Sequence, residues 1–210
     1  MRKMVSGPIR DKSRTKAKLI RAIGKIIKTR GFQQLKVTYV AKTAGVDKKL
    51  IYEYFGSVEN LVNEYLRKQD YGSSAQQIDF SKTDFLDSGK EYSKTLIANM
   101  LEALSKNKEL RQIIIWELSE SNEMLRKLSD HREELGMILF NKVMLPYFKE
   151  NEKKYRAILA ILISSAYYLS LHAESNGSLF AGLDIRQNDD RQAINDAVND
   201  IIDMAYEKYK

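Results

Sequence analysis

Apolar residues recur at spacings of three and four through most of this 210-residue chain, and that periodicity constrains the fold more than any other feature. Such spacing places the apolar side chains along one side of an α-helix. The chain has only two prolines and ten glycines, so few positions interrupt a helix. Alternating runs of apolar and polar residues, which are typical of strands, are few. The sequence therefore predicts an all-α protein of about nine helices.

The positions of helix-breaking and capping residues set the expected helix boundaries. Pro146 is expected to end or kink its helix because it lacks a backbone donor. Two glycines, Gly177 and Gly182, make residues 176–184 a loop. The expected helices cover residues 13–30, 37–44, 47–55, a stretch that starts near 57, and then 84–105, 108–119, 123–147, 152–175 and 189–209.

Charge divides the chain into two parts. Residues 1–70 carry 17 Lys and Arg against 6 Asp and Glu, a balance of +11, whereas residues 71–210 carry 18 against 22, a balance of −4. A segment rich in Gly, Ser and Gln at residues 71–83 marks the boundary. We expect a loose basic arm at residues 1–12, a small helical domain at residues 13–70 and a larger helical domain beyond it. A polyanion is the natural partner of a small basic domain, although many Lys-rich helix faces are simply solvated.

Composition argues against several classes of protein. The chain has no Cys and only two His, and we find neither a phosphate-binding glycine loop nor a cluster with metal-ligand spacing. The basic N-terminus is followed by no long apolar run, and the longest uncharged stretch, residues 157–173, is too short and too polar to span a bilayer. We therefore expect a cytoplasmic protein that is not an enzyme, does not contact a membrane, and uses neither a metal nor a cofactor.

Residues 37–55 have the pattern of a helix-turn-helix. Small side chains such as Ala41 allow the first short helix to approach a second one closely, and Gly45 supplies the left-handed conformation that ends it. Ile51 and Phe55, four residues apart, anchor the second helix to the core. This arrangement leaves the opposite side of the second helix in solvent.

That outward side carries two lysines and a tyrosine, Lys48, Lys49 and Tyr52, with Asp47 placed to cap the helix. A short exposed helix of this size and charge fits the major groove of DNA. The pattern favours double-stranded DNA as the partner of the basic domain.

Residues 17–66 resemble the DNA-binding domain of the TetR family of transcriptional regulators, and no gap is needed to align them. The resemblance is carried by Gly31, Phe32, Val37, Val40, Ala41, Ala44, Gly45, Val46, Ile51, Tyr52, Tyr54, Phe55 and Leu61. It implies that Lys48 and Tyr52 contact phosphates, and that Thr38, Lys49 and Leu50 lie where bases are read. Lys36 and Tyr39 complete the expected DNA-binding residues.

At three positions the sequence departs from the family pattern. These departures affect which of the family's DNA contacts can be assigned to this chain. Lys36 stands where the family usually has a capping Ser or Thr, and Val58 stands where it usually has Lys at the start of the fourth helix. Glu53 replaces a residue that is often basic or aromatic. It could accept a hydrogen bond from a cytosine amino group, but we favour a solvated glutamate.

A ligand-sensing role for the larger domain depends on polar aromatic residues that stand among apolar ones. A His and Tyr on a buried helix can orient a small-molecule effector in an apolar pocket. The alternative, that they are satisfied core or interface residues, is equally favoured for each residue taken singly. The candidates are Trp116, Tyr167, Tyr168 and His172, joined by Tyr92, Met100 and Phe140 because the family resemblance implies that their helices surround a cavity.

The last two helices predict a homodimer. The helix at 152–175 is apolar nearly all round between residues 157 and 171, and the last helix carries a second apolar stripe. Two such helices from each chain make a four-helix interface, and a dimer pairs two weak reading helices on a pseudo-palindromic operator. The resulting hypothesis is a dimeric repressor that a small molecule releases from DNA. The alternative is a helical protein-interaction module whose basic end binds an acidic partner.

Overall fold

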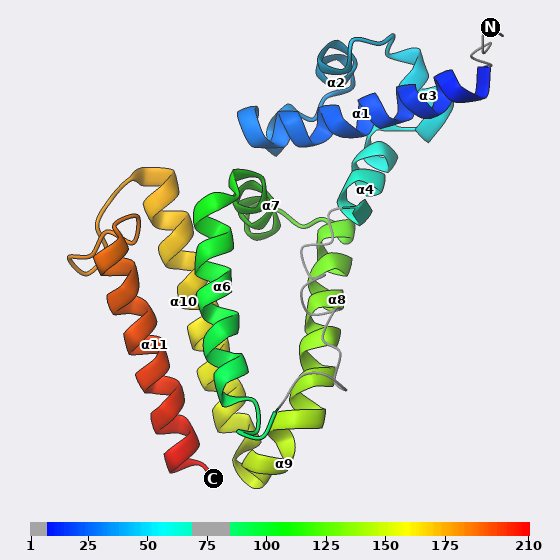
Figure 1. Ribbon diagram of the computed structural model, residues 1–210. Coiled ribbons are helices and arrows are strands. Elements are labelled where there is room, and N and C mark those ends of the chain that lie inside the picture. The colour runs from blue at the N-terminus through cyan, green and yellow to red at the C-terminus, as the bar shows by residue number, and fades with distance from the viewer. Residues whose placement is uncertain (1–7, 69–84) are drawn as a thin grey trace, which may run out of the picture. The chain divides into compact units, whose positions relative to one another are not determined.

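The computed structural model describes residues 8–68 and 85–210, so the expected boundary at residues 71–83 and the first seven residues of the expected arm lie outside the described residues (Figure 1). The described chain is helical, with one isolated β-bridge between Phe180 and Leu183 and no strand. The prediction of an all-α fold is confirmed. The described residues form two compact units.

Unit 1 contains the described residues up to Lys68 together with Gln112–Ser129, and unit 2 contains the rest. Two helices, α7 (Lys108–Ser119) and α8 (Glu123–Leu139), therefore have residues in both units. The division differs from the one expected at residue 70 because a segment from the middle of the chain clusters with the N-terminal helices. The other elements of unit 1 are α1 (Pro8–Arg30), η1 (Phe32–Gln34), α2 (Val37–Ala44), α3 (Lys49–Phe55) and α4 (Val58–Lys68).

Helix α1 begins at Pro8, so part of the arm expected at residues 1–12 is helical instead. Proline suits a first helical position because its fixed φ matches the helix and its missing N–H would have no partner there. The helix ends at Arg30, where Gly31 takes a φ of 80° and its N–H donates to the carbonyl of Ile27. Gly31 therefore ends α1, as the sequence predicts.

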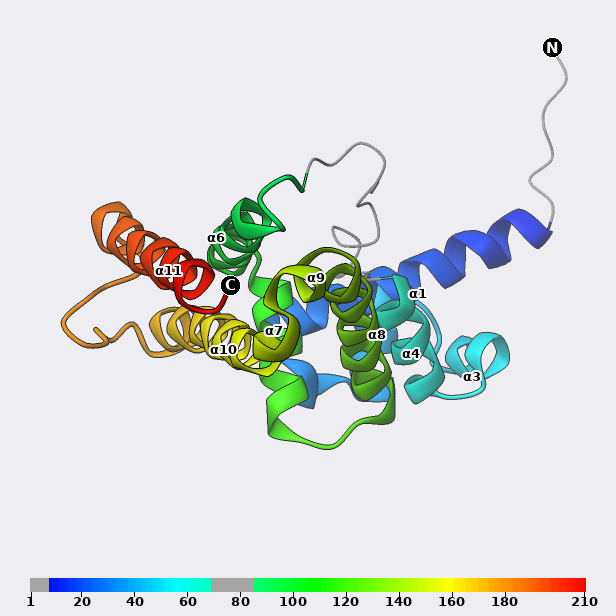
Figure 2. The same ribbon diagram turned by 90° about the horizontal axis from the view of Figure 1, so that it is seen from below.

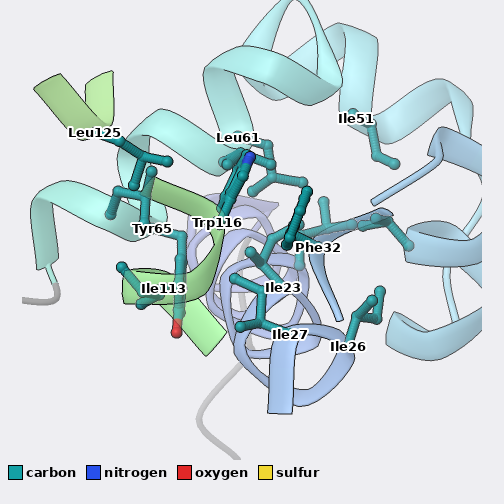
Figure 3. Close-up of a cluster of buried hydrophobic side chains, with 14 of the residues drawn as sticks. Ile23, Ile26, Ile27, Phe32, Ile51, Leu61, Tyr65, Ile113, Trp116 and Leu125 are labelled. Atoms are coloured by element: carbon teal, nitrogen blue, oxygen red, sulfur yellow. The ribbon is translucent and has the colours of Figure 1, made fainter. Parts of the chain in front are cut away.

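The core of unit 1 forms where α1 packs against α2 and α4. Leu19, Ile23 and Ile27 lie on one side of α1 and are fully buried. The phenyl ring of Phe32 stacks on the indole of Trp116, with ring centroids 5.1 Å apart and planes 6° apart (Figure 3). This stack ties Gln112–Ser129 to the N-terminal helices and explains why that segment belongs to unit 1.

Unit 2 is built around three long helices, α6 (Lys90–Lys106), α10 (Glu152–Asn176) and α11 (Asn188–Lys208). Helix α6 packs on both α10 and α11, and the three lie side by side in Figure 1 and in the turned view of Figure 2. The buried residues that join them include Ile97 and Ile202.

Helix α6 begins six residues after the expected start at residue 84. Ser88 and Gly89 have φ values of 59° and 86°, which a right-handed helix does not contain. The carboxylate of Asp87 accepts hydrogen bonds from the N–H groups of Gly89, at 3.0 Å, and Glu91, at 2.6 Å. Asp87 thus caps the helix after this turn.

Pro146 does not end the helical stretch around it. Instead, the helix changes its hydrogen-bonding pattern just before the proline. Before it lies a π-helix, Phe140–Met144, in which the N–H of Leu145 donates to the carbonyl of Phe140 five residues earlier. The wider π-turn accommodates the proline, which then occupies the first turn of α9 (Leu145–Phe148). The helix expected over 123–147 is therefore three consecutive helical pieces, followed by η3 (Lys149–Asn151).

A cluster of tyrosines closes one end of unit 2. The hydroxyl of Tyr155 donates to Ser93 Oγ at 2.8 Å, and the hydroxyl of Tyr206 donates to the carbonyl of Ser88 at 2.9 Å. Tyr147 donates in turn to the carbonyl of Tyr206 at 2.9 Å. Burial raises the pKa of both Tyr155 and Tyr206 above the ordinary tyrosine value. These buried hydroxyls are satisfied, so the cluster stabilises the fold.

Candidate nucleic-acid interface

Helices α2 and α3 are joined by a tight turn at Gly45. Gly45 has φ 65° and ψ 41°, a left-handed conformation that glycine adopts without the steric cost of a Cβ. The N–H of Val46 then donates to the carbonyl of Ala41 at 3.1 Å, which satisfies the end of α2. The glycine therefore fixes the direction in which α3 leaves α2.

Helix α3 is held at both ends. The Oδ1 atom of Asp47 accepts a hydrogen bond from the N–H of Lys49 at 2.8 Å and caps the first turn, as the sequence predicts. Ile51 is fully buried beneath the helix. At the other end, the side-chain amide of Asn60 donates to the carbonyl of Phe55 at 2.9 Å, and Ser57 Oγ accepts from the N–H of Asn60 at 3.1 Å and caps α4. One side of α3 is thus fixed to the core, and the other side faces solvent.

The side chains expected to contact DNA lie on α2, on α3 and in the residues just before them. Five of the seven are exposed, with Tyr52 at 54%, and the other two are half-buried. The exposed residues are Lys36, Thr38, Lys48, Lys49 and Tyr52, and the half-buried ones are Tyr39 and Leu50.

Two lysines of α1 lie next to α3, a contact that the sequence analysis did not identify. Lys12 Nζ is 5.2 Å from the ring centre of Tyr54, and Lys16 Nζ is 5.3 Å from that of Phe55. Both distances suit a cation–π contact. The aromatic pair that ends α3 is the only sequence signal for it. These contacts place positive charge from α1 beside the end of the reading helix.

The structure shows the surroundings of the three residues that depart from the family pattern. Lys36 precedes α2 in an extended conformation, and no side-chain hydrogen bond caps that helix. Glu53 is exposed on α3. Val58 is half-buried at the start of α4 and packs against the core of unit 1. Val58 therefore contributes apolar contacts at the start of α4.

Trp116, a predicted ligand-binding residue, lies in unit 1 and not with the other six. It is 5% exposed, stacks on Phe32, and its indole N–H donates to a carboxylate oxygen of Glu120. Its surroundings are those of a satisfied core residue. The sequence analysis gave a satisfied core residue as the equally favoured alternative for Trp116, but it did not identify Phe32 as the partner, because the two residues are far apart along the chain.

Three other predicted ligand-binding residues, Tyr92, Met100 and Phe140, pack in or against the core of unit 2. Tyr92 makes an edge contact with Phe85 at 6.0 Å, and burial raises the pKa of Tyr92. The guanidinium of Arg156 lies 3.7 Å from the ring centre of Phe140, which is 4% exposed. These three side chains therefore pack within unit 2.

The last three candidates lie near the C-terminal end of α10. Tyr167 is half-buried, while Tyr168 is 52% exposed and stacks on His172 with ring centroids 5.6 Å apart. His172 lies 17 residues after Tyr155 on the same helix, about 26 Å along its axis. His172 alone among the seven lines a cavity of about 180 Å³. Of the seven predicted residues, Trp116 therefore belongs to unit 1, three belong to or pack against the core of unit 2, and three lie in the C-terminal part of α10.

One helical stretch in the described residues, Glu123–Asn176, contains a segment long and apolar enough to cross a membrane by length and composition alone. Most of that segment is not buried inside the protein. This is weak grounds for a membrane span, since core and interface helices of soluble proteins have the same composition.

Comparison with known families identifies the helix-turn-helix. The sequence profile of the tetR family of bacterial regulatory proteins matches residues 19–65, which include α2, the turn and α3. No curated protein sequence matches the chain significantly. The profile supports the DNA-binding hypothesis and gives no support to the alternative of a protein-interaction module.

Solved structures share the fold over nearly the whole chain. The transcriptional regulator FadR from Bacillus subtilis, in complex with stearoyl-CoA, is 18% identical with a TM-score of 0.61, and the match covers 89% of this chain and 96% of that one. For FadR from Bacillus halodurans the identity is 16%, the TM-score 0.59 and the coverage 99% of both chains.

A third neighbour is NalD from Pseudomonas aeruginosa, the secondary repressor of the MexAB-OprM multidrug efflux pump. It is 17% identical with a TM-score of 0.54, and the match covers 90% of this chain and 95% of that one. At these identities the likeness extends to the fold, and the family assignment comes from the profile at residues 19–65. Residues 19–65 match the DNA-binding domain of the tetR family of bacterial regulatory proteins, and they contain the helix-turn-helix of α2 and α3.

Proposed function

We propose that the protein is a dimeric repressor that binds a pseudo-palindromic operator and is released from it by a small molecule. The single observation that carries the proposal is the exposed side of α3 with Lys48 and Lys49 at its start, in a helix that is fixed on a buried core by Ile51 and capped by Asp47. A reading helix must be rigid relative to its domain for base-edge contacts to discriminate between sequences. As DNA is its ligand, we place the protein in the cytoplasm, and the proposal includes no enzymatic step.

The proposed DNA contacts divide into two groups. Lys48, Tyr52 and the lysines of α1 supply contacts with phosphates, which position the protein on any sequence. Thr38, Lys49 and Leu50 supply contacts with base edges, which select the operator. The exposure of Lys48 and Lys49 supports both roles. Lys12 and Lys16, beside the end of α3, strengthen the phosphate group.

A second copy of the chain is the proposed partner of α10 and α11. Each helix carries an exposed stripe at three- and four-residue spacing, formed by Ala157, Ile161, Ser164 and Tyr168 on α10 and by Ala193, Ala197, Ile201 and Met204 on α11. Ile161 is 66% exposed and Met204 is 57% exposed. Neither stripe contains a charged residue. A symmetric dimer would cover both stripes and give the two reading helices that a palindrome requires.

The effector is proposed from the neighbours. The B. subtilis regulator is in complex with stearoyl-CoA, so acyl thioesters are the first class to test on this chain. NalD is the secondary repressor of a multidrug efflux pump, so drugs are the second class to test. We expect an effector to lower the affinity for operator DNA without dissociating the protein dimer.

Selection of DNA from a random pool by the purified protein tests the proposal. We expect the recovered fragments to share two half-sites related by two-fold symmetry, with centres one helical turn, about 10 base pairs, or a multiple apart. Adding stearoyl-CoA to the complex then tests release. A pool without enrichment contradicts the proposal, and a single asymmetric half-site contradicts the dimer.

A further inference from the structure

Helix α1 carries a row of positive charge on the side that points away from the core of unit 1. Leu19, Ile23 and Ile27 are fully buried on its inner side, in the cluster drawn in Figure 3. With about 100° of rotation per residue, the opposite side of the helix carries five basic side chains at spacings of four and three residues, and all five are exposed. We call them the α1 basic stripe: Arg14, Lys18, Arg21, Lys25 and Lys28.

No negative charge offsets the α1 basic stripe within α1 or by contact. Residues 12–30 contain no Asp or Glu. None of the five side chains forms an ion pair or a hydrogen bond with another residue in the ranges 8–68 and 85–210. Neighbours along the stripe are three or four residues apart, a spacing at which like charges destabilise a helix. The helix dipole favours a basic residue only in the last turn, which among the five applies to Lys28 alone.

The stripe has the length and the chemistry to bind an extended polyanion. Arg14 and Lys28 are about 21 Å apart along the helix axis. A small anion cannot contact charges spread over that length, whereas about 21 Å of a DNA duplex carries roughly twelve phosphates. A lipid surface fits less well, because helices that lie on membranes insert an apolar face. The apolar face of α1 is buried in its own unit, and none of the exposed residues in 12–30 is apolar.

The duplex that α3 contacts does not extend along the stripe. Lys12 and Lys16, which contact the aromatic pair at the end of α3, lie roughly opposite the stripe around α1. The stripe and α3 are therefore on different sides of unit 1. DNA is stiff over about 150 base pairs, so the DNA that flanks an operator does not fold back around a small domain. A duplex on the stripe is thus a distant segment of the same DNA or another molecule.

We propose that the α1 basic stripe is a second DNA-binding surface, which holds a separate duplex by its phosphates while α3 holds the operator. Phosphate contacts carry no sequence information, so the second duplex is bound without sequence preference. Two α3 helices, one from each chain of the proposed dimer, share the first duplex. That side therefore fills first, and a substitution in the stripe leaves the affinity for the first duplex unchanged.

The inference rests on the proposed function in one respect, because it takes α3 to hold the first duplex. The experiment therefore follows the two duplexes separately, by two-colour fluorescence cross-correlation on the full-length protein. A red operator duplex, taken from the random-pool selection and just long enough for one dimer, is bound to saturation. A green duplex of the same length and scrambled sequence is then added.

We expect green and red duplexes to diffuse together at low salt. Five phosphate contacts give a slope of about −4.5 for log affinity against log salt, so capture of the green duplex should weaken about 500-fold between about 50 and 200 mM salt. The green duplex should be captured equally well whatever its sequence.

A triple variant, Arg14→Gln with Lys18→Gln and Arg21→Gln, removes three of the five charges and keeps good helix formers at these positions. The slope for green capture should fall by about 3, and capture at about 50 mM salt should weaken at least roughly 100-fold. Operator affinity at about 150 mM salt should change less than about twofold, because charges farther away than about 8 Å are screened there. Retained operator binding also shows that the variant is folded.

The matched control removes three exposed lysines from helices of unit 2, by Lys108→Gln, Lys153→Gln and Lys208→Gln, and should leave green capture unchanged. The proposal is overturned if operator-saturated wild-type protein captures no green duplex, or if the triple stripe variant captures it as well as the wild type. Binding of phosphatidylglycerol vesicles in place of the green duplex would also overturn it, and would assign the stripe to a membrane surface. Failure to bind the red duplex contradicts the proposed function and this inference together, whereas red binding without green capture contradicts this inference alone.

Discussion

Unit 1 and unit 2 differ in what they bury and in what they expose. Unit 1 buries an apolar core closed by the Phe32–Trp116 stack and exposes Lys48 and Lys49 at the start of α3. Unit 2 buries a hydrogen-bonded tyrosine cluster and exposes apolar stripes on α10 and α11. The outer surface of each unit therefore matches a different partner. A basic surface is complementary to DNA, and an uncharged apolar surface is complementary to another protein chain.

The largest expected effect comes from breaking the stack in unit 1. Trp116→Ala removes a buried indole and leaves a cavity, so we expect the free energy of unfolding to fall by about 3–5 kcal/mol. Chemical denaturation followed by circular dichroism measures this. Leu118→Ala is the control, because Leu118 is on the same helix but 73% exposed, and its expected change is within about 0.5 kcal/mol. A loss below about 1 kcal/mol for Trp116→Ala would show that the stack does not hold this core together.

The next effect tests the apolar stripes of unit 2. Ile161→Glu combined with Ile201→Glu would place two carboxylates from each chain in the proposed interface, where a charge without a partner costs several kcal/mol. We expect light scattering to give a monomer mass near 24 kDa for this variant and twice that for the wild-type protein. Ala103→Glu, at an exposed position on α6, should remain dimeric. A dimer that survives the double substitution would place the interface elsewhere.

A smaller effect concerns how the stability of the two units depends on pH. Burial raises the pKa of Tyr155 and Tyr206 above 10.0, the value of an unperturbed tyrosine, so both prefer to be neutral in the folded protein. Their contribution to stability is intact below about pH 10 and is lost as the pH rises further, because the unfolded chain gives up these protons first.

Tyr206→Phe should therefore weaken the alkaline fall in stability, while costing about 0.5–1.5 kcal/mol at neutral pH for the lost hydrogen bond to Ser88. Urea unfolding at neutral and alkaline pH measures both changes. Tyr52→Phe, at an exposed tyrosine of unit 1, is the matched control and should leave the pH dependence as it is. An equal alkaline loss in Tyr206→Phe and the wild type would rule out this tyrosine as the cause.

Local patterns in the sequence predicted unit 1 better than unit 2. The turn at Gly45, the cap at Asp47 and the buried side of α3 depend on residues close together in the chain, and each was expected. The Phe32–Trp116 stack joins distant segments, so no local pattern indicates it. In unit 2 the start of α6 was misplaced because the left-handed turn at Ser88 is unusual for a serine. Trp116, expected to share a pocket with residues of the larger domain, belongs to unit 1, because helix periodicity does not determine which helices become neighbours.

The central claim is that α3 reads DNA with a division of labour between Lys48 and Lys49. The direct measurement is the affinity of Lys48→Ala and Lys49→Ala for operator and scrambled duplexes across a salt series, with Lys25→Ala, an exposed lysine farther along α1, as the control. Lys48→Ala should weaken binding to both duplexes alike and reduce the slope of log affinity against log salt by about 1 per subunit. Lys49→Ala should cost roughly 1–3 kcal/mol on the operator and little on scrambled DNA. Equal losses on both duplexes for Lys49→Ala would contradict the division of labour, and the absence of salt-dependent binding by the wild-type protein would contradict the DNA-binding function itself.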